Sequence, residues 1–97
     1  MRIRLAILEN DAVYLNRIVS IFNVRYADKL EIYSFTDRDA AIQSLRSTKI
    51  DVFLANEVFE VDETEIPSNC GFAYLVDSVD IKTLKDVVAI CKFQKAE

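Results

Sequence analysis

The chain has 97 residues, which is enough for one domain. Apolar residues make up 52% of it and charged residues 29%, a balance typical of a globular protein. The net charge of −4 argues against nucleic acid as a partner, because a phosphate backbone would repel it. Without any histidine, the chain cannot use histidine for catalysis or for binding a metal.

The cysteine pattern and the hydropathy indicate a cytoplasmic domain. Cys70 and Cys91 are far apart and neither lies in a CxxC motif, so we interpret them as buried thiols in a reducing compartment. No apolar stretch approaches the roughly 18–20 residues of a membrane span, and no signal-peptide pattern is present. We therefore expect no membrane insertion, although a larger parent protein could still lie at a membrane.

The first third of the chain predicts a strand followed by a helix. Residues 3–8 form a short apolar run that ends at a polar cluster, as expected of a strand buried on both faces. Asn10 or Asp11 is a natural N-cap for a helix over residues 12–26. The apolar residues of this helix fall on one stripe, at three- and four-residue steps: Leu15, Ile18, Val19, Phe22 and Tyr26.

The middle of the chain predicts two more strands around a second helix. Residues 30–35 alternate apolar and polar side chains, which is typical of a half-exposed strand. Thr36 and Asp37 cap a helix that we expect to run to Arg46. Its inner face consists of Ala41, Ile42 and Leu45. A third strand is predicted over residues 50–55.

The last third predicts two further strands joined by little helix. Residues 57–68 are acidic and contain Pro67, so any helix there is expected to be short or frayed. Strands are predicted over residues 72–76 and 87–91, with at most two helical turns over residues 78–85 between them. Strands alternating with helices predict an α/β fold with a parallel sheet and right-handed crossovers.

In an open parallel sheet, functional residues gather at the carboxyl ends of the strands. Those ends carry the polar and charged residues Glu9, Asn10, Asp11, Asn56, Glu57, Asp77 and Lys92, together with Val76. This order resembles the receiver domain of response regulators, over nearly the whole chain. The resemblance implies a flavodoxin-like three-layer sandwich, with a five-stranded sheet in the order 2-1-3-4-5. It further implies that helices 3 and 4 are shortened here, and that helix 5 is missing or truncated.

Matched to the receiver pattern, this sequence departs from it at most functional positions. The phosphoacceptor position holds Asn56, and the acidic pair that binds Mg²⁺ in receivers is represented by Glu9 and Asn10, with Asp11 beside them. Val76 stands at the hydroxyl position, and a one-residue shift to Asp77 would not restore that hydroxyl. The remaining matched positions are the switch position, the retained lysine and the residue after it: Ala89, Lys92 and Phe93. Because Phe93 replaces a proline, we expect a trans peptide bond before it.

These departures imply a domain without phosphotransfer chemistry. An acyl phosphate requires a carboxylate nucleophile, and the amide of Asn56 is not one. Mg²⁺ prefers anionic oxygens, and two of the three usual carboxylates are amides here. We therefore expect no enzyme activity, no catalytic residue, no cofactor and no metal site. A weakly held cation at Glu9 and Asp11 stays open, as does neutralisation of these carboxylates by the Lys92 ammonium.

Within the receivers, three segments resemble the degenerate N-terminal domain of CpaE/TadZ-type pilus-assembly proteins: L-A-I-L-E-N-D, Y-A-D-K-L-E-I-Y-S-F-T-D and A-I-C-K-F-Q. Such proteins are similar to an inactive receiver fused to a ParA/MinD-like ATPase, and they help to place the pilus machinery at a cell pole. The resemblance implies that residues 1–97 form a single receiver-like domain at the N-terminus of a longer protein.

A pseudo-receiver of this kind would bind proteins, dimerise or localise an attached ATPase. By analogy with receivers, its contact surface would include Ile81, Leu84 and Val87 with Tyr74 behind them, although these residues also fit an ordinary core. One alternative is an active receiver that accepts phosphate on Glu57 or Asp77. Another is a small enzyme or electron carrier of flavodoxin-like fold, which is disfavoured because the acidic cluster at residues 9–11 would repel a flavin phosphate.

Overall fold

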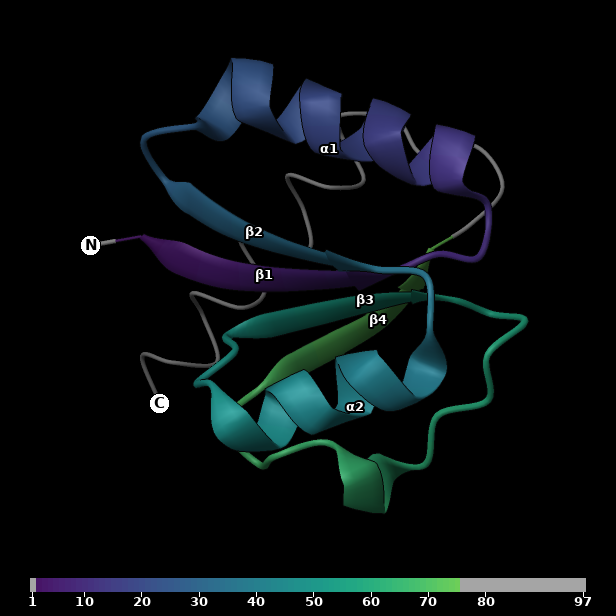
Figure 1. Cartoon of the computed structure of the whole chain (residues 1–97). Helices are drawn as coiled ribbons and strands as arrows, with labels where there is room; N and C mark the ends of the chain where they lie inside the picture. Colours follow the sequence, from purple (N-terminus) through teal and green to yellow (C-terminus); the bar gives the residue numbers. More distant parts are fainter. Residues whose placement is uncertain (1, 76–97) are drawn as a thin grey trace.

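The computed structural model describes residues 2–75, which form an alternating α/β unit (Figure 1). Its elements are, in chain order, β1 (Ile3–Leu8), α1 (Ala12–Tyr26), β2 (Leu30–Phe35), α2 (Arg38–Ser47), β3 (Val52–Asn56), the 3-10 turn η1 (Glu63–Glu65) and β4 (Gly71–Leu75). The helical turns expected over residues 78–85 and the strand expected over residues 87–91 lie outside the described part of the chain.

The strands form one parallel sheet in the order β2-β1-β3-β4. β1 is the inner strand that pairs with both β2 and β3, with Leu5 opposite Ile32 on one side and opposite Val52 on the other. This order confirms the predicted α/β class and the first four strands of the receiver topology.

The sheet is covered on both faces, by α1 on one and by α2 with the connection between β3 and β4 on the other (Figure 1). Alternate residues of β1 therefore enter two different cores. Leu5 and Ile7 pack under α1, whereas Ala6 and Leu8 pack under α2. All of these side chains are buried, as predicted for a strand without a solvent face.

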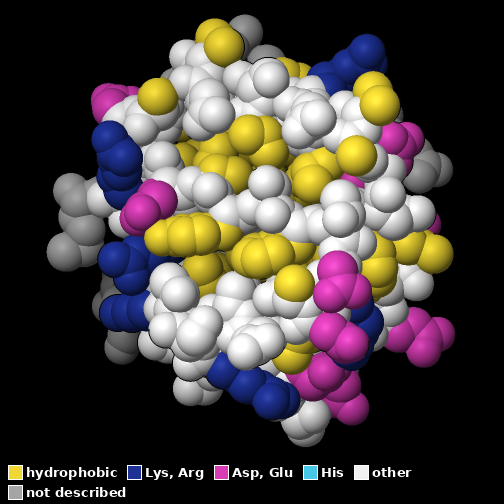
Figure 2. Space-filling model, viewed as in Figure 1, with side chains coloured by type: hydrophobic (Ala, Val, Ile, Leu, Met, Phe, Trp, Pro, Cys, Tyr) yellow, Lys and Arg dark blue, Asp and Glu magenta, His cyan; other side chains and the backbone are white. Residues whose placement is uncertain are grey.

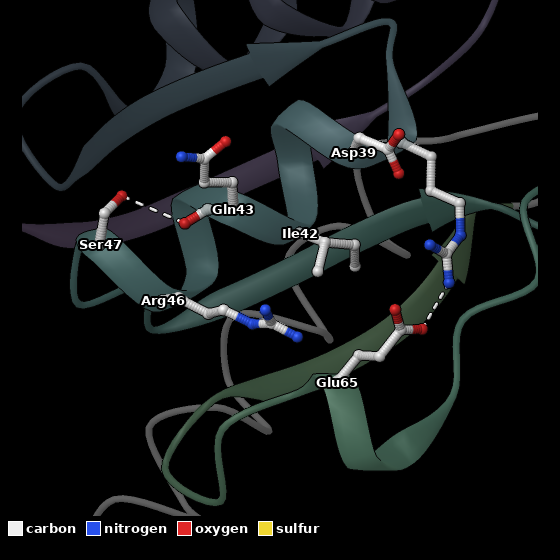
Figure 3. A pocket seen from close by; sticks show the side chains of 7 residues that line it. Asp39, Ile42, Gln43, Arg46, Ser47 and Glu65 are labelled. Carbon is white, nitrogen blue, oxygen red and sulfur yellow. Dashed lines mark hydrogen bonds and ion pairs between the residues drawn. The ribbon is translucent and has the colours of Figure 1, made fainter.

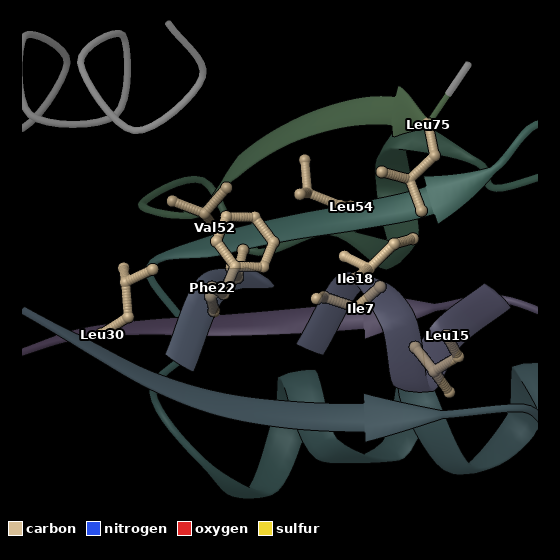
Figure 4. Packing of buried hydrophobic residues seen from close by; sticks show 9 residues of the cluster. Ile7, Leu15, Ile18, Phe22, Leu30, Val52, Leu54 and Leu75 are labelled. Atoms are coloured by element: carbon tan, nitrogen blue, oxygen red, sulfur yellow. The ribbon is translucent and has the colours of Figure 1, made fainter. Parts of the chain in front are cut away.

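Helix α1 begins at Asp11, whose side-chain Oδ1 accepts hydrogen bonds from the backbone N–H groups of Val13 (3.0 Å) and Tyr14 (3.2 Å). Its buried stripe faces β1, β2 and β3 (Figure 4) and contains Leu15, Ile18 and Phe22. Burial of each such large apolar side chain stabilises the fold by about 1.5–3 kcal/mol. The predicted helix and its stripe are confirmed.

Helix α2 is capped by Asp37, which accepts a hydrogen bond from the N–H of Ala40 at 3.1 Å. Its inner face consists of Ala41, Ile42 and Leu45, as predicted, and it ends one residue beyond the expected Arg46. The predicted third strand was too early, because residues 50 and 51 precede β3 and Asn56 still pairs with Leu75 of β4. The predicted fourth strand was one residue late, since β4 starts at Gly71.

The connection between β3 and β4 contains only the single turn η1, which confirms the expectation of a short helix there. Asp62 and Glu65 form a capping box across this turn. Arg38 attaches the connection between β3 and β4 to helix α2. Its Nε donates a hydrogen bond to the carbonyl of Glu60 at 3.0 Å, and its guanidinium pairs with the carboxylate of Glu65. Phe59 and Val61 of this connection pack against the core under α2.

Candidate functional site

The carboxyl edge of the sheet brings together three of the predicted site residues. Glu9 and Asp11 follow β1, and Asn56 is the last residue of β3. Because β1 and β3 are parallel neighbours, their carboxyl ends meet. We name Glu9, Asp11 and Asn56 the carboxyl-edge cluster.

Glu9 is the centre of the cluster and is almost completely buried, with 1% of its surface exposed. Its Oε1 accepts a hydrogen bond from the side-chain Nδ2 of Asn56 at 2.7 Å. Its Oε2 accepts another from the backbone N–H of Asp11 at 2.9 Å. Both carboxylate oxygens are therefore held by neutral donors, an arrangement that offsets the cost of removing this group from water.

Asn56 uses both ends of its amide. Its Oδ1 accepts a hydrogen bond from the backbone N–H of Val58 at 2.9 Å, while its Nδ2 faces Glu9. An ionised carboxylate can only accept, so the amide nitrogen and not the oxygen must point to Glu9. Asn56 is thus fixed between the end of β1 and the turn after β3, and it places no carboxylate at the acceptor position.

The other predicted residues of this edge are more exposed. Asp11 is exposed and its Oδ1 is engaged as the N-cap of α1, while Asn10 and Glu57 are also exposed. The remaining predicted positions lie outside the described residues: Val76, Asp77, Ala89, Lys92 and Phe93. Neutralisation of Glu9 or Asp11 by Lys92 therefore stays a prediction.

The cluster provides two carboxylates and one amide, with one of the carboxylates already satisfied by N–H donors. Within residues 2–75, no group of three or more aspartate, glutamate, histidine or cysteine side chains is arranged to hold a metal ion. The weakly held cation at Glu9 and Asp11 stays an untested alternative. The geometry as it stands supports a hydrogen-bonded junction between strand ends.

Sequence reasoning missed two polar interactions. The hydrogen bond between Asn56 and Glu9 was not predicted, although two polar residues at the ends of adjacent parallel strands were a signal for it. Asp51, buried at 5% exposure, was not singled out either. Its Oδ2 accepts a hydrogen bond from the backbone N–H of Arg4 at 2.9 Å, which ties the start of β3 to β1 at the opposite edge of the sheet.

A shallow groove of about 600 Å³ lies between α2 and η1 (Figure 3). It is lined by Arg38, Asp39, Ile42, Gln43, Arg46, Ser47 and Glu65. The Asp62 backbone amide, with the Arg38 guanidinium as the second cause, lowers the pKa of Glu65 below its ordinary value. The lining charges are balanced, and none of these residues belongs to the carboxyl-edge cluster, so the groove offers no support to the receiver chemistry.

Comparison with known families settles the class of the domain. The family model described as "TadZ-like, receiver domain" matches residues 1–97. The chain belongs to this family. A search among curated proteins finds no match. Membership in this family confirms the resemblance to receivers and, among them, to the CpaE/TadZ type, and the sheet order agrees with a truncated flavodoxin-like receiver fold.

The described part of this TadZ-like receiver domain contains no helix that is long and apolar enough to cross a membrane. The longest helix within residues 2–75, α1, has 15 residues and carries its buried apolar side chains on one stripe.

Proposed function

We propose that this TadZ-like receiver domain is a pseudo-receiver that acts by binding proteins and is not switched by phosphorylation. One observation carries the proposal: the side chain at the acceptor position, Asn56, is an amide whose nitrogen donates to the buried Glu9 at 2.7 Å. An amide nitrogen or oxygen in this role cannot form the acyl phosphate that a carboxylate forms.

The environment of Glu9 adds a second reason. In a receiver that binds Mg²⁺, acidic side chains at this edge are neutralised by the cation. Here the N–H groups of Asn56 and Asp11 already occupy both oxygens of Glu9. A cation would have to displace these donors before it could bind to Glu9. The hydrogen bonds of Glu9 therefore compete with metal binding at the carboxyl edge.

The proposed partners are proteins, including a second copy of the domain and an attached ATPase of the ParA/MinD type. Support for the ATPase comes from the three segments that resemble CpaE/TadZ-type pilus-assembly proteins, which are similar to a receiver fused to such an ATPase; the family match itself names a receiver domain. A net charge of −4 disfavours nucleic acid as a competing partner. Targeting of the ATPase within the cytoplasm, at a cell pole, is the role that fits a domain of this kind.

The proposal is tested by treating the 97-residue chain with acetyl phosphate and Mg²⁺ and measuring its intact mass. We expect no added phosphoryl group, while an active receiver in the same reaction is labelled. The variant Asn56→Asp is also expected to stay unlabelled, because a carboxylate alone restores neither the paired acidic site nor the missing hydroxyl at Val76.

Labelling of the unchanged chain would contradict the proposal. Peptide mapping would then decide for the alternative function, an active receiver with a non-standard acceptor, if the label were found on Glu57 or Asp77. Labelling of Asn56→Asp alone would show that the other substitutions matter less than argued above.

A further inference from the structure

Strand β2 forms an outer edge of the described sheet, and half of its backbone groups point away from the sheet. The N–H of Ile3 bonds the carbonyl of Lys29, and the N–H of Glu9 bonds the carbonyl of Phe35. Backbone groups of a strand alternate between its two sides. The odd-numbered residues therefore bond β1, whereas Leu30, Ile32 and Ser34 direct both N–H and C=O to the open edge.

This edge lacks several of the features that prevent strand pairing. The register with β1 runs without interruption from Leu30 to Phe35, so there is no bulge, and β2 contains neither proline nor lysine. Its one charged side chain, Glu31, is paired with Arg4 of β1. Ile32, Tyr33 and Phe35 are only half-buried. Figure 2, viewed from the same side as Figure 1, shows the face of the molecule on which β2 lies. Apolar side chains gather in the middle of that face, between the α1 and α2 layers.

We propose that two copies of this domain associate by antiparallel pairing of their β2 strands, with the two-fold axis at Ile32. This register uses all three residues whose backbone groups point to the open edge, with the middle one, Ile32, on the two-fold axis. Ile32 then lies opposite Ile32 of the second copy, and Leu30 lies opposite Ser34. Each opposed pair exchanges two hydrogen bonds, which gives roughly six between the chains. The inference specifies one partner of the proposed binding role and rests on that role.

The side chains of β2 are complementary to themselves in this register. Leu30 and Ile32 face the α1 side, and Tyr33 faces the α2 side, so a two-fold axis normal to the sheet keeps each set on its own side. Glu31 then lies opposite Tyr33 of the second copy and not opposite the second Glu31. The two Glu31 charges are thereby kept from lying directly opposite each other.

Continuity of structure also favours a second copy over an unrelated peptide. The pairing joins two four-stranded sheets into one, and it places the α1 helices on one common face. The carboxyl-edge cluster does not take part, because its hydrogen bonds lie at the strand ends and not along the β2 edge.

The test compares Ser34→Pro with Ser34→Ala in the 97-residue chain, by sedimentation equilibrium over a range of concentrations. Ser34 is exposed and its N–H is not used by β1, so proline removes an interchain donor without removing a bond inside the chain. We expect a reversible dimer for the unchanged chain. Ser34→Pro should weaken the dimer about tenfold or more, and Ser34→Ala should leave it within about twofold.

Amide hydrogen exchange on the unchanged chain provides a readout that does not depend on the folding of a variant. The N–H groups of Ile32 and Ser34 should become protected as the concentration rises, whereas that of Tyr33 is protected throughout by β1. A chain that stays monomeric at every concentration would overturn the proposal and leave the edge to another protein. A dimer without protection at Ile32 and Ser34 would overturn it too.

Failure of this pairing can be told apart from failure of the pseudo-receiver proposal. The mass measurement with acetyl phosphate reports only on phosphorylation, and the exchange of Ile32 and Ser34 reports only on the β2 edge.

Discussion

At the scale of single residues, the junction of Glu9 and Asn56 is the feature on which the proposed pseudo-receiver role rests. A carboxylate and an amide are complementary, since one accepts and the other donates, and they meet at 2.7 Å. Two carboxylates in the same places would repel each other unless a proton or a cation lay between them. Asn56 therefore satisfies one oxygen of the buried Glu9 by a hydrogen bond.

Exchanging these two residues tests the junction. Asn56→Asp should lower the free energy of unfolding by about 1–3 kcal/mol at neutral pH, because Glu9 loses a donor and gains a like charge. The double variant Glu9→Gln/Asn56→Asp restores one amide and one carboxylate in reversed places. It should recover most of the loss, as measured by urea unfolding.

The single variant Glu9→Gln is the matched control. It completes a double-mutant cycle, which separates the pairwise interaction from the effect of each substitution. Equal stability of the single and double variants at neutral pH would contradict the described hydrogen bond.

The residues of this site were predictable, but their bonds were not. Polar residues after apolar runs indicated the strand ends, and parallel pairing implied that Glu9, Asp11 and Asn56 meet. The hydrogen bond between Asn56 and Glu9 depends on side-chain orientation and on the one-residue extension of β3 to Asn56. Hydropathy alone does not determine either of these.

At the scale of elements, β2 carries a titratable pair that reports on its local structure. A hydrogen bond to Glu31 is the largest cause that raises the pKa of Tyr33 above its ordinary value of 10.0, followed by burial and by repulsion from the Glu31 charge. Arg4, which pairs with Glu31 at 3.3 Å, acts in the opposite direction.

We expect Glu31→Gln to lower the pKa of Tyr33 toward its ordinary value, because the charge and the carboxylate acceptor are lost together. Because the pKa of Tyr33 is raised in the folded state, its contribution to the free energy of unfolding is fully present below the pKa of the unfolded state and is lost as the pH rises through the pKa of the folded state. Nuclear magnetic resonance of the tyrosine rings at low protein concentration measures the pKa of Tyr33, with Tyr33→Phe to assign the signal. An unchanged midpoint in Glu31→Gln would contradict the described pair.

The elements differ in how well their patterns predicted them. The helices were predictable because their stripes repeat every three to four residues and Asp11 and Asp37 cap them. The start of β3 was predicted too early because the apolar run begins at Ile50. In the structure, the strand begins only after Asp51, whose side chain accepts a hydrogen bond from the backbone N–H of Arg4. The course of the β3–β4 connection was not predictable, since it depends on Arg38 reaching Glu60 and Glu65 across the fold.

At the scale of the whole molecule, two cores on either side of one sheet hold the carboxyl edge in place. Leu8 is buried directly before Glu9, and Ala55 is buried directly before Asn56, so both ends of the junction continue from packed strands. Under the pseudo-receiver proposal, this junction is a structural contact, and the sheet edge at β2 is the described surface that we propose for a partner.

The most direct test of this account is a titration of the isotope-labelled chain with Mg²⁺ and beryllofluoride, a mimic of a bound phosphoryl group, followed by nuclear magnetic resonance. The signals to follow are the side-chain amide of Asn56 and the backbone amides of Glu9, Asp11 and Val58. We predict that they stay unchanged, because Asn56 offers no carboxylate and Glu9 is already hydrogen-bonded. Saturable shifts of these signals would show a working phosphoryl site and would contradict the account.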